Sequence, residues 1–116
     1  MIYPDIEIYV KEQPTEDVLS WIKERVGITA QEELRRDGKR VFDLTVGDPA
    51  YQCLIICRVN GDFSSIWFNS TRLPWTSDVD CAVDCATALD TEVRCQDPDS
   101  EAWIRVRDQQ QSTIDW

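Results

Sequence analysis

Two turn clusters divide the middle of the chain into three short segments with strand character. Gly47-Asp48-Pro49 and Asn60-Gly61-Asp62 are built from residues that favour turns. Short connections predict an antiparallel meander of the three strands. The middle segment contains Leu54-Ile55-Ile56 and is apolar on both faces, as expected of a central strand with cover on each side. The three predicted strands are 41–46, 51–59 and 63–70.

A predicted helix lies on each side of this meander. Pro14 at a first helical position, acids in the following turn and a stop at Gly27 predict a helix over 14–27. Ser77, with Asp80 three residues later, resembles a capping box and opens a second helix over 77–89.

Each predicted helix has an apolar stripe at helical spacing. In the first helix Trp21 falls outside the stripe, so we expect a flanking or exposed residue. In the second, Cys85 lies near the margin of the stripe and Cys81 further out. The expected buried faces are Val18, Leu19, Ile22 and Val26 in the first helix, and Val79, Ala82, Val83, Ala86 and Leu89 in the second.

The two ends of the chain complete the predicted fold. Residues 5–11 alternate polar and apolar, which predicts a strand with one buried face, and 91–96 predicts another. Residues 28–34 suit a helical turn or an extended arm equally well. The overall expectation is an α+β fold with a mainly antiparallel sheet in β-α-β-β-β-α-β order, in a single layered domain. We expect both helices on one sheet face, although 51–59 leaves room for cover on the other.

The C-terminal part is less regular. Residues 103–107 could form a last strand, so the predicted domain spans 1–107. The remaining residues, 108–116, are polar and rich in glutamine, and we expect a loosely held tail unless Ile114 or Trp116 docks.

The sequence lacks the residues or the spacing that several kinds of active site and cofactor site need. The chain of 116 residues has no histidine, which removes the commonest general base and transition-metal ligand. Its four glycines are spread too widely for a phosphate-binding loop, so we expect no nucleotide cofactor. The five cysteines form no CxxC pair, and we expect free thiols, no metal site and no cofactor of any kind. The longest apolar run, Cys53 to Cys57, is far too short to cross a membrane, and the first residues do not resemble a signal peptide, so we expect a cytoplasmic protein.

The order of elements from Pro14 to Leu89, helix, three strands and helix, is similar to that of double-stranded-RNA-binding domains. Those domains need a basic start to the second helix to bind phosphates, whereas here Asp78, Asp80 and Asp84 occupy that region. The basic cluster of Arg35, Arg36, Lys39 and Arg40 lies at a turn and is typical of a solvated tip. We therefore expect no direct binding to nucleic acid.

Negative charge is concentrated near the C-terminus. The net charge is −10, and residues 73–116 contain ten acids against three bases. Such a field attracts a positively charged partner, although a merely solvated face would have the same composition. The five tryptophans add large rigid side chains that serve either as covers for a small core or as binding anchors. The candidate partner-binding residues are Asp78, Asp80, Asp84, Asp90, Glu92, Asp97, Trp75 and Trp103.

These observations favour a small acidic binding protein without enzymatic activity. The expected role is that of an inhibitor or immunity-type antidote that occupies a basic protein such as a toxin or nuclease. One alternative is a structural or adaptor subunit that self-associates through an edge strand. Another is an enzyme that works with carboxylates alone or with Cys81 as nucleophile near a helix N-terminus, although neighbouring acids oppose formation of its thiolate.

Overall fold

The computed structural model describes residues 5–116, which form an eight-stranded antiparallel sheet and two helices. This confirms the α+β class and the antiparallel sheet, but the expected order contained too few strands. The elements along the chain are β1 (Ile6–Lys11), α1 (Thr15–Val26), β2 (Ile28–Arg36), β3 (Lys39–Val46), β4 (Tyr51–Asn60), β5 (Phe63–Phe68), α2 (Asp78–Leu89), β6 (Val93–Gln96), β7 (Trp103–Arg107) and β8 (Gln110–Ile114).

Strands at the two edges of the sheet account for this difference. The segment 28–34, whose sequence suited a helical turn or an extended arm equally well, belongs to β2 and pairs with β3. The expected polar tail contains β8, which pairs with β7, and Trp116 docks beyond it on aromatic side chains. An edge strand is solvated on one side and needs no regular apolar pattern, which explains why periodicity did not predict β2 and β8.

The sheet order is β2-β3-β4-β5-β1-β6-β7-β8, with every neighbouring pair antiparallel. The first strand therefore lies inside the sheet and joins a four-stranded meander to a three-stranded one. Four strands, rather than three, separate the two helices. The order therefore differs from the arrangement of double-stranded-RNA-binding domains to which the sequence pattern is similar.

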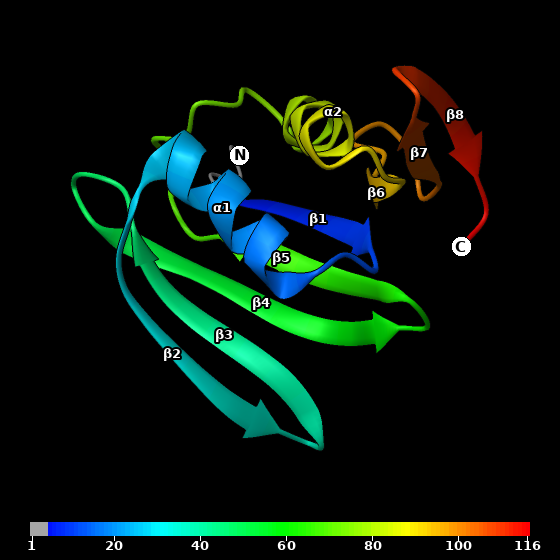
Figure 1. Ribbon diagram of the computed structural model, residues 1–116. Coiled ribbons are helices and arrows are strands. Elements are labelled where there is room, and N and C mark those ends of the chain that lie inside the picture. The colour runs from blue at the N-terminus through cyan, green and yellow to red at the C-terminus, as the bar shows by residue number, and fades with distance from the viewer. Residues whose placement is uncertain (1–4) are drawn as a thin grey trace.

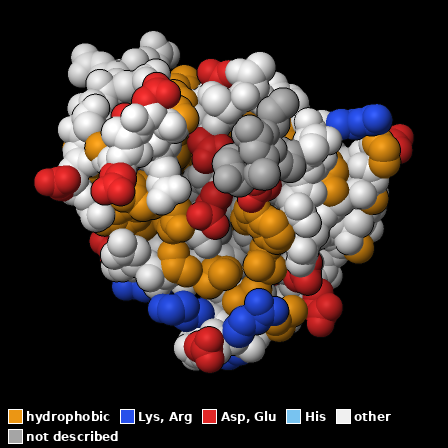
Figure 2. All heavy atoms as spheres, turned by 180° about the vertical axis from the view of Figure 1, so that it is seen from behind, with side chains coloured by type: hydrophobic (Ala, Val, Ile, Leu, Met, Phe, Trp, Pro, Cys, Tyr) orange, Lys and Arg blue, Asp and Glu red, His pale blue; other side chains and the backbone are white. Residues whose placement is uncertain are grey.

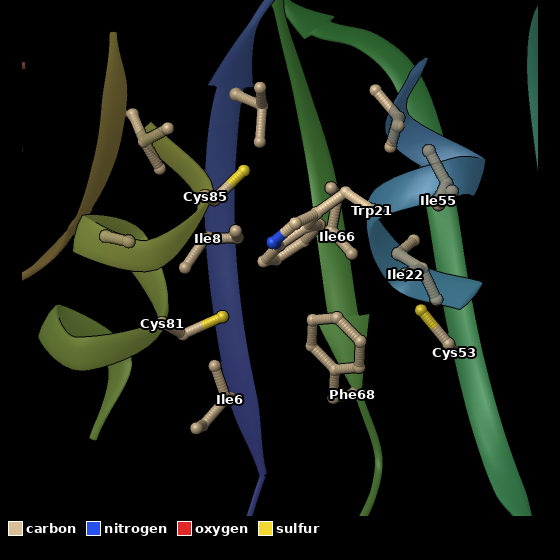
Figure 3. Close-up of a cluster of buried hydrophobic side chains, with 14 of the residues drawn as sticks. Ile6, Ile8, Trp21, Ile22, Cys53, Ile55, Ile66, Phe68, Cys81 and Cys85 are labelled. Atoms are coloured by element: carbon tan, nitrogen blue, oxygen red, sulfur yellow. The ribbon is translucent and has the colours of Figure 1, made fainter. Parts of the chain in front are cut away.

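Both helices cover the same face of the sheet (Figure 1). In the core between them, Ile8 of β1 and Ile66 of β5 are paired neighbours, and Ile22 of α1 packs over the same layer (Figure 3). Each helix has 12 residues, and within residues 5–116 neither has the length and apolar character needed to cross a membrane.

Trp21 does not flank the core as expected but is buried, with only 2% of its surface exposed. Its ring packs against Phe68 of β5 and against Trp75 in the segment before α2. The apolar stripe of α1 indicates only which side of this helix faces the sheet. Trp21 points instead toward the space between the two helices (Figure 3), where a second helix and a connecting segment cover it.

The buried face of α2 is also rotated from the expected one. Cys81 and Cys85 are fully buried, as is Ala82, whereas Val79 and Val83 are only partly buried. Small side chains let α2 approach β1, β6 and β7 closely, so the Ala and Cys positions face the sheet and the larger valines lie at its flanks.

Candidate functional site

The sheet face opposite the helices contains a hollow of about 770 Å³. Its apolar floor includes Leu54 and Ile56 of β4 and Trp67 of β5. Residues 76–79 at the start of α2 and residues 96–98 at the end of β6 also line the hollow. Figure 2 shows this side of the molecule, with hydrophobic side chains across the middle and acidic ones beside them.

Four carboxylates line the hollow: Asp5, Glu7, Asp78 and Asp97. Glu7 lies in β1 opposite Trp67, and Asp5 directly precedes this strand. Hydrogen bonds hold the side chains in place. The Trp67 indole donates to Asp5 Oδ2 over 2.8 Å, and the Tyr9 hydroxyl donates to Glu7 Oε1 over 3.0 Å.

Asp97 is fixed by the loop that follows β6. Its Oδ1 accepts a hydrogen bond of 2.9 Å from the backbone N–H of Asp99, and its Oδ2 accepts one of 3.0 Å from Ser100 Oγ. Such local bonds favour a turn over a continued strand. The loop thereby holds Asp97 among the residues that line the hollow.

Asp78 is the carboxylate whose charge is most disfavoured. Burial raises its pKa from 3.8 to about 6, against a hydrogen bond with the Glu7 backbone that lowers it. The negative charges of Asp5 and Glu7 raise the pKa further. No described residue that lines the hollow is a lysine or an arginine, so no described side chain of the lining neutralises these carboxylates.

A second, smaller hollow of about 290 Å³ lies beside Val26, at the C-terminal end of α1. It is lined by Asp48, Tyr51 and Arg72, among others, so it contains both signs of charge. The excess of one sign therefore distinguishes the larger hollow.

Two of the eight predicted partner-binding residues, Asp78 and Asp97, meet in the larger hollow. Asp80 and Asp90 are exposed on α2 and at its C-terminal cap. Asp80 accepts a hydrogen bond from Thr76 and, through its backbone N–H, donates to the capping Ser77. Asp80 and Asp90 therefore lie on the surface, and neither lines the hollow.

Asp84 joins the two helices. Its Oδ2 accepts hydrogen bonds from Arg25 Nε over 2.8 Å and from the Trp75 indole over 2.9 Å, and its Oδ1 accepts one from the second guanidinium nitrogen. These bonds, led by those from Arg25, hold the pKa of Asp84 below its ordinary value. Trp75 itself is 8% exposed and packs on Phe68, so it covers the core.

Glu92 and Trp103 lie in an aromatic and ionic cluster on the uncovered sheet face. The Glu92 side chain is only 5% exposed and pairs with Arg94 at 2.7 Å and Arg105 at 3.0 Å. Burial raises the pKa of Glu92, but the two arginines outweigh this and lower it overall. The Trp103 ring packs edge-on against Tyr9 and Trp116.

Sequence reasoning did not find Asp5, Glu7 and Trp67 as site residues, although a signal for their placement was present. The alternation in 5–11 puts Asp5 and Glu7 on the polar face of β1. That Trp67 would lie beside them depends on the pairing of β1 with β5, which are far apart in the chain.

The cysteines offer no comparable site. All five are free, and Cys81 is completely buried, with a pKa that burial raises well above the ordinary value. A buried, protonated thiol is a poor nucleophile, so the proposed role of Cys81 in catalysis loses its physical basis. Among residues 5–116 no three Cys, Asp or Glu side chains come together in a way that would hold a metal ion.

Comparison with known proteins gives no match to a protein family, a curated protein or a solved structure. The functional argument therefore depends on the geometry and charge of this chain's own surface.

Proposed function

We propose that this chain is a small acidic binding protein that accepts a lysine or arginine side chain of a basic protein partner in the larger hollow. The observation that carries the proposal is the group of four carboxylates beside an apolar floor, without a cation among the described lining residues. The role that such a surface fits best is that of an inhibitor or immunity-type antidote to a toxin or nuclease.

The two parts of the hollow suit the two parts of a basic side chain. The aliphatic stem of lysine or arginine packs well on apolar surface such as Leu54, Ile56 and Trp67. The charged end then reaches the carboxylates, and hydrogen bonds between ionised groups are stronger than those between neutral ones. A cation beside Asp78 also offsets the cost of holding that carboxylate in a half-buried position.

The net charge of −10 supports the same class of partner. An excess of one sign accelerates encounter with a surface of the opposite sign, and toxins that act on nucleic acid have positively charged substrate grooves. An acidic protein that fills such a groove would block the substrate by competing for the same cations.

The test uses a purified partner captured at low salt from the native host. Binding to the wild type is compared with binding to Asp78→Asn/Asp97→Asn, which removes two carboxylates from the hollow and keeps their size. The control, Asp99→Asn/Glu101→Gln, removes two charges from the neighbouring exposed loop. We expect the first variant to weaken binding by about tenfold or more, and the control to alter mainly the association rate at low salt.

Acidification gives an independent readout. Binding is expected to weaken as the pH falls below about 6, because Asp78 then takes up a proton. Equal affinities of both double variants for the captured partner, at low salt and neutral pH, would show that the hollow does not carry the interaction.

A further inference from the structure

The outer edge of β2 is open. No strand within residues 5–116 pairs with it, and it forms one end of the sheet (Figure 1). All of its residues are exposed except Ile28 and Leu34, which are partly buried. An open edge of nine residues offers unpaired backbone N–H and C=O groups to another strand.

Charges of the same sign face each other across β2 and β3. On the uncovered sheet face, Glu32 lies opposite Asp43 and Arg36 lies opposite Lys39. Directly opposed like charges destabilise a strand pair. Neither Glu32 nor Arg36 forms an ion pair with any residue in 5–116. Each therefore lacks a counter-charge within the described chain.

The sequence of this part of β2 is self-complementary in charge. It reads Glu32-Glu33-Leu34-Arg35-Arg36, with two acids before a central leucine and two bases after it. If a second copy of β2 runs antiparallel and Leu34 faces Leu34, each acid lies opposite a base. Glu32 then faces Arg36 of the second copy, and Glu33 faces Arg35.

We propose that the open edge of β2 pairs with β2 of a second copy of this chain, around a two-fold axis at Leu34. The proposal does not depend on the binding function of the hollow. The hollow is formed over β4, β5 and β1, so pairing at the edge leaves it free in both copies.

The phase of the hydrogen bonds agrees with this register. Asp37 and Gly38 both have positive φ, of 55° and 78°, as in the type I′ turn of a two-residue hairpin. The pair that closes such a turn, Arg36 with Lys39, is hydrogen-bonded, and the pattern alternates along the strand. The backbone N–H and C=O groups of Glu33 and Arg35 therefore point outward. Across the two-fold axis, Glu33 of one copy and Arg35 of the other can exchange backbone hydrogen bonds through these groups.

Leu34 adds an apolar contact at the centre. It lies opposite Val41, which in turn lies opposite Ile56, so the three form an apolar row on the uncovered face. Pairing at Leu34 joins the rows of two copies and removes the partly exposed leucine from water. The other edge strand, β8, carries no charge pattern of this kind, which makes β2 the edge that recognises its own copy.

A charge-swap experiment tests the pairing. Glu32→Lys places two like-charged contacts across the two-fold axis, as does Arg36→Glu. Within the hairpin both changes replace a like-charged pair by an attractive one, opposite Asp43 and Lys39 respectively, so the fold is not put at risk.

We expect the wild type to form a concentration-dependent dimer by sedimentation velocity, and each variant alone to dimerise about tenfold or more weakly. An equimolar mixture of the two variants should recover the dimer, because the introduced lysine of one chain then faces the introduced glutamate of the other. Glu101→Lys and Arg72→Glu, at exposed positions outside β2, are the matched controls and should dimerise as the wild type does, separately and when mixed.

A cysteine at the centre tests the register. In a non-hydrogen-bonded antiparallel pair the Cα atoms are about 4.5 Å apart, a distance that a disulfide spans. Leu34→Cys should give a covalent dimer under mild oxidation, whereas Glu101→Cys should not. The proposal is wrong if the wild type sediments as a monomer up to millimolar concentration, or if the mixed variants associate no better than either alone.

Discussion

Replacing Asp78 by Asn should stabilise the protein at neutral pH. Asn has almost the same shape and keeps an oxygen that can accept the hydrogen bond from the Glu7 backbone, but it cannot ionise. The pKa of the Asp78 carboxyl rises from 3.8 to about 6 because of burial and the nearby negative charges. Folding therefore favours the protonated form, and the wild type bears the cost of charging this group.

The magnitude follows from the size of the pKa change. A rise from 3.8 to about 6 corresponds to about 3 kcal/mol for a fully buried group. Asp78 is only half-buried, and solvent screening reduces the expected gain to about 1 kcal/mol. The contribution of this carboxyl to wild-type stability is fully present below pH 3.8 and is lost as the pH rises through about 6.

Urea unfolding, followed by tryptophan fluorescence from pH 4 to 8, measures the effect. The difference in free energy of unfolding between Asp78→Asn and the wild type should be near zero at pH 4 and reach its plateau above pH 7. Glu101→Gln, which removes one exposed charge, is the control for the change in net charge. A difference that does not vary with pH would refute the assigned environment of Asp78, and a destabilised variant at pH 8 would refute the sign.

Two further substitutions and a thiol titration test other parts of the structure. Asp84→Ala should lower the free energy of unfolding by about 2–3 kcal/mol, because it leaves Arg25 and the Trp75 indole without their shared acceptor. Urea unfolding at pH 7 measures this loss, and a loss below about 0.5 kcal/mol would contradict the role of Asp84 as acceptor. Trp116→Ala should lower the free energy of unfolding by about 2 kcal/mol and increase hydrogen exchange in β8, since the Trp116 ring packs on three aromatic rings and the Arg94 guanidinium lies over it. Unchanged exchange would show that the ring does not hold this strand. Thiol titration of the native protein should modify Cys57 alone, with all five cysteines reacting after unfolding without reductant, and rapid native modification of a second thiol would contradict the burial of the other four.

The sequence predicted those elements that have a regular apolar period and a local start or stop. The helix from Pro14 to Gly27 and the strands around Asn60-Gly61 lie where expected, within a few residues, because caps and tight turns depend on neighbouring residues. Asp78 and Asp97 were found as candidate site residues because an excess of acid is visible in the composition.

Only the tertiary structure decided which of these residues act together. β1 lies between β5 and β6, a placement that involves strands distant in the chain, and it brings Glu7 beside Trp67. The packing of one helix against the other made Asp84 a structural acceptor and buried Trp21. The local sequence pattern determines which side chains can be buried or charged. The partner of each side chain depends on contacts between distant segments, and such contacts produce no repeating pattern in the sequence.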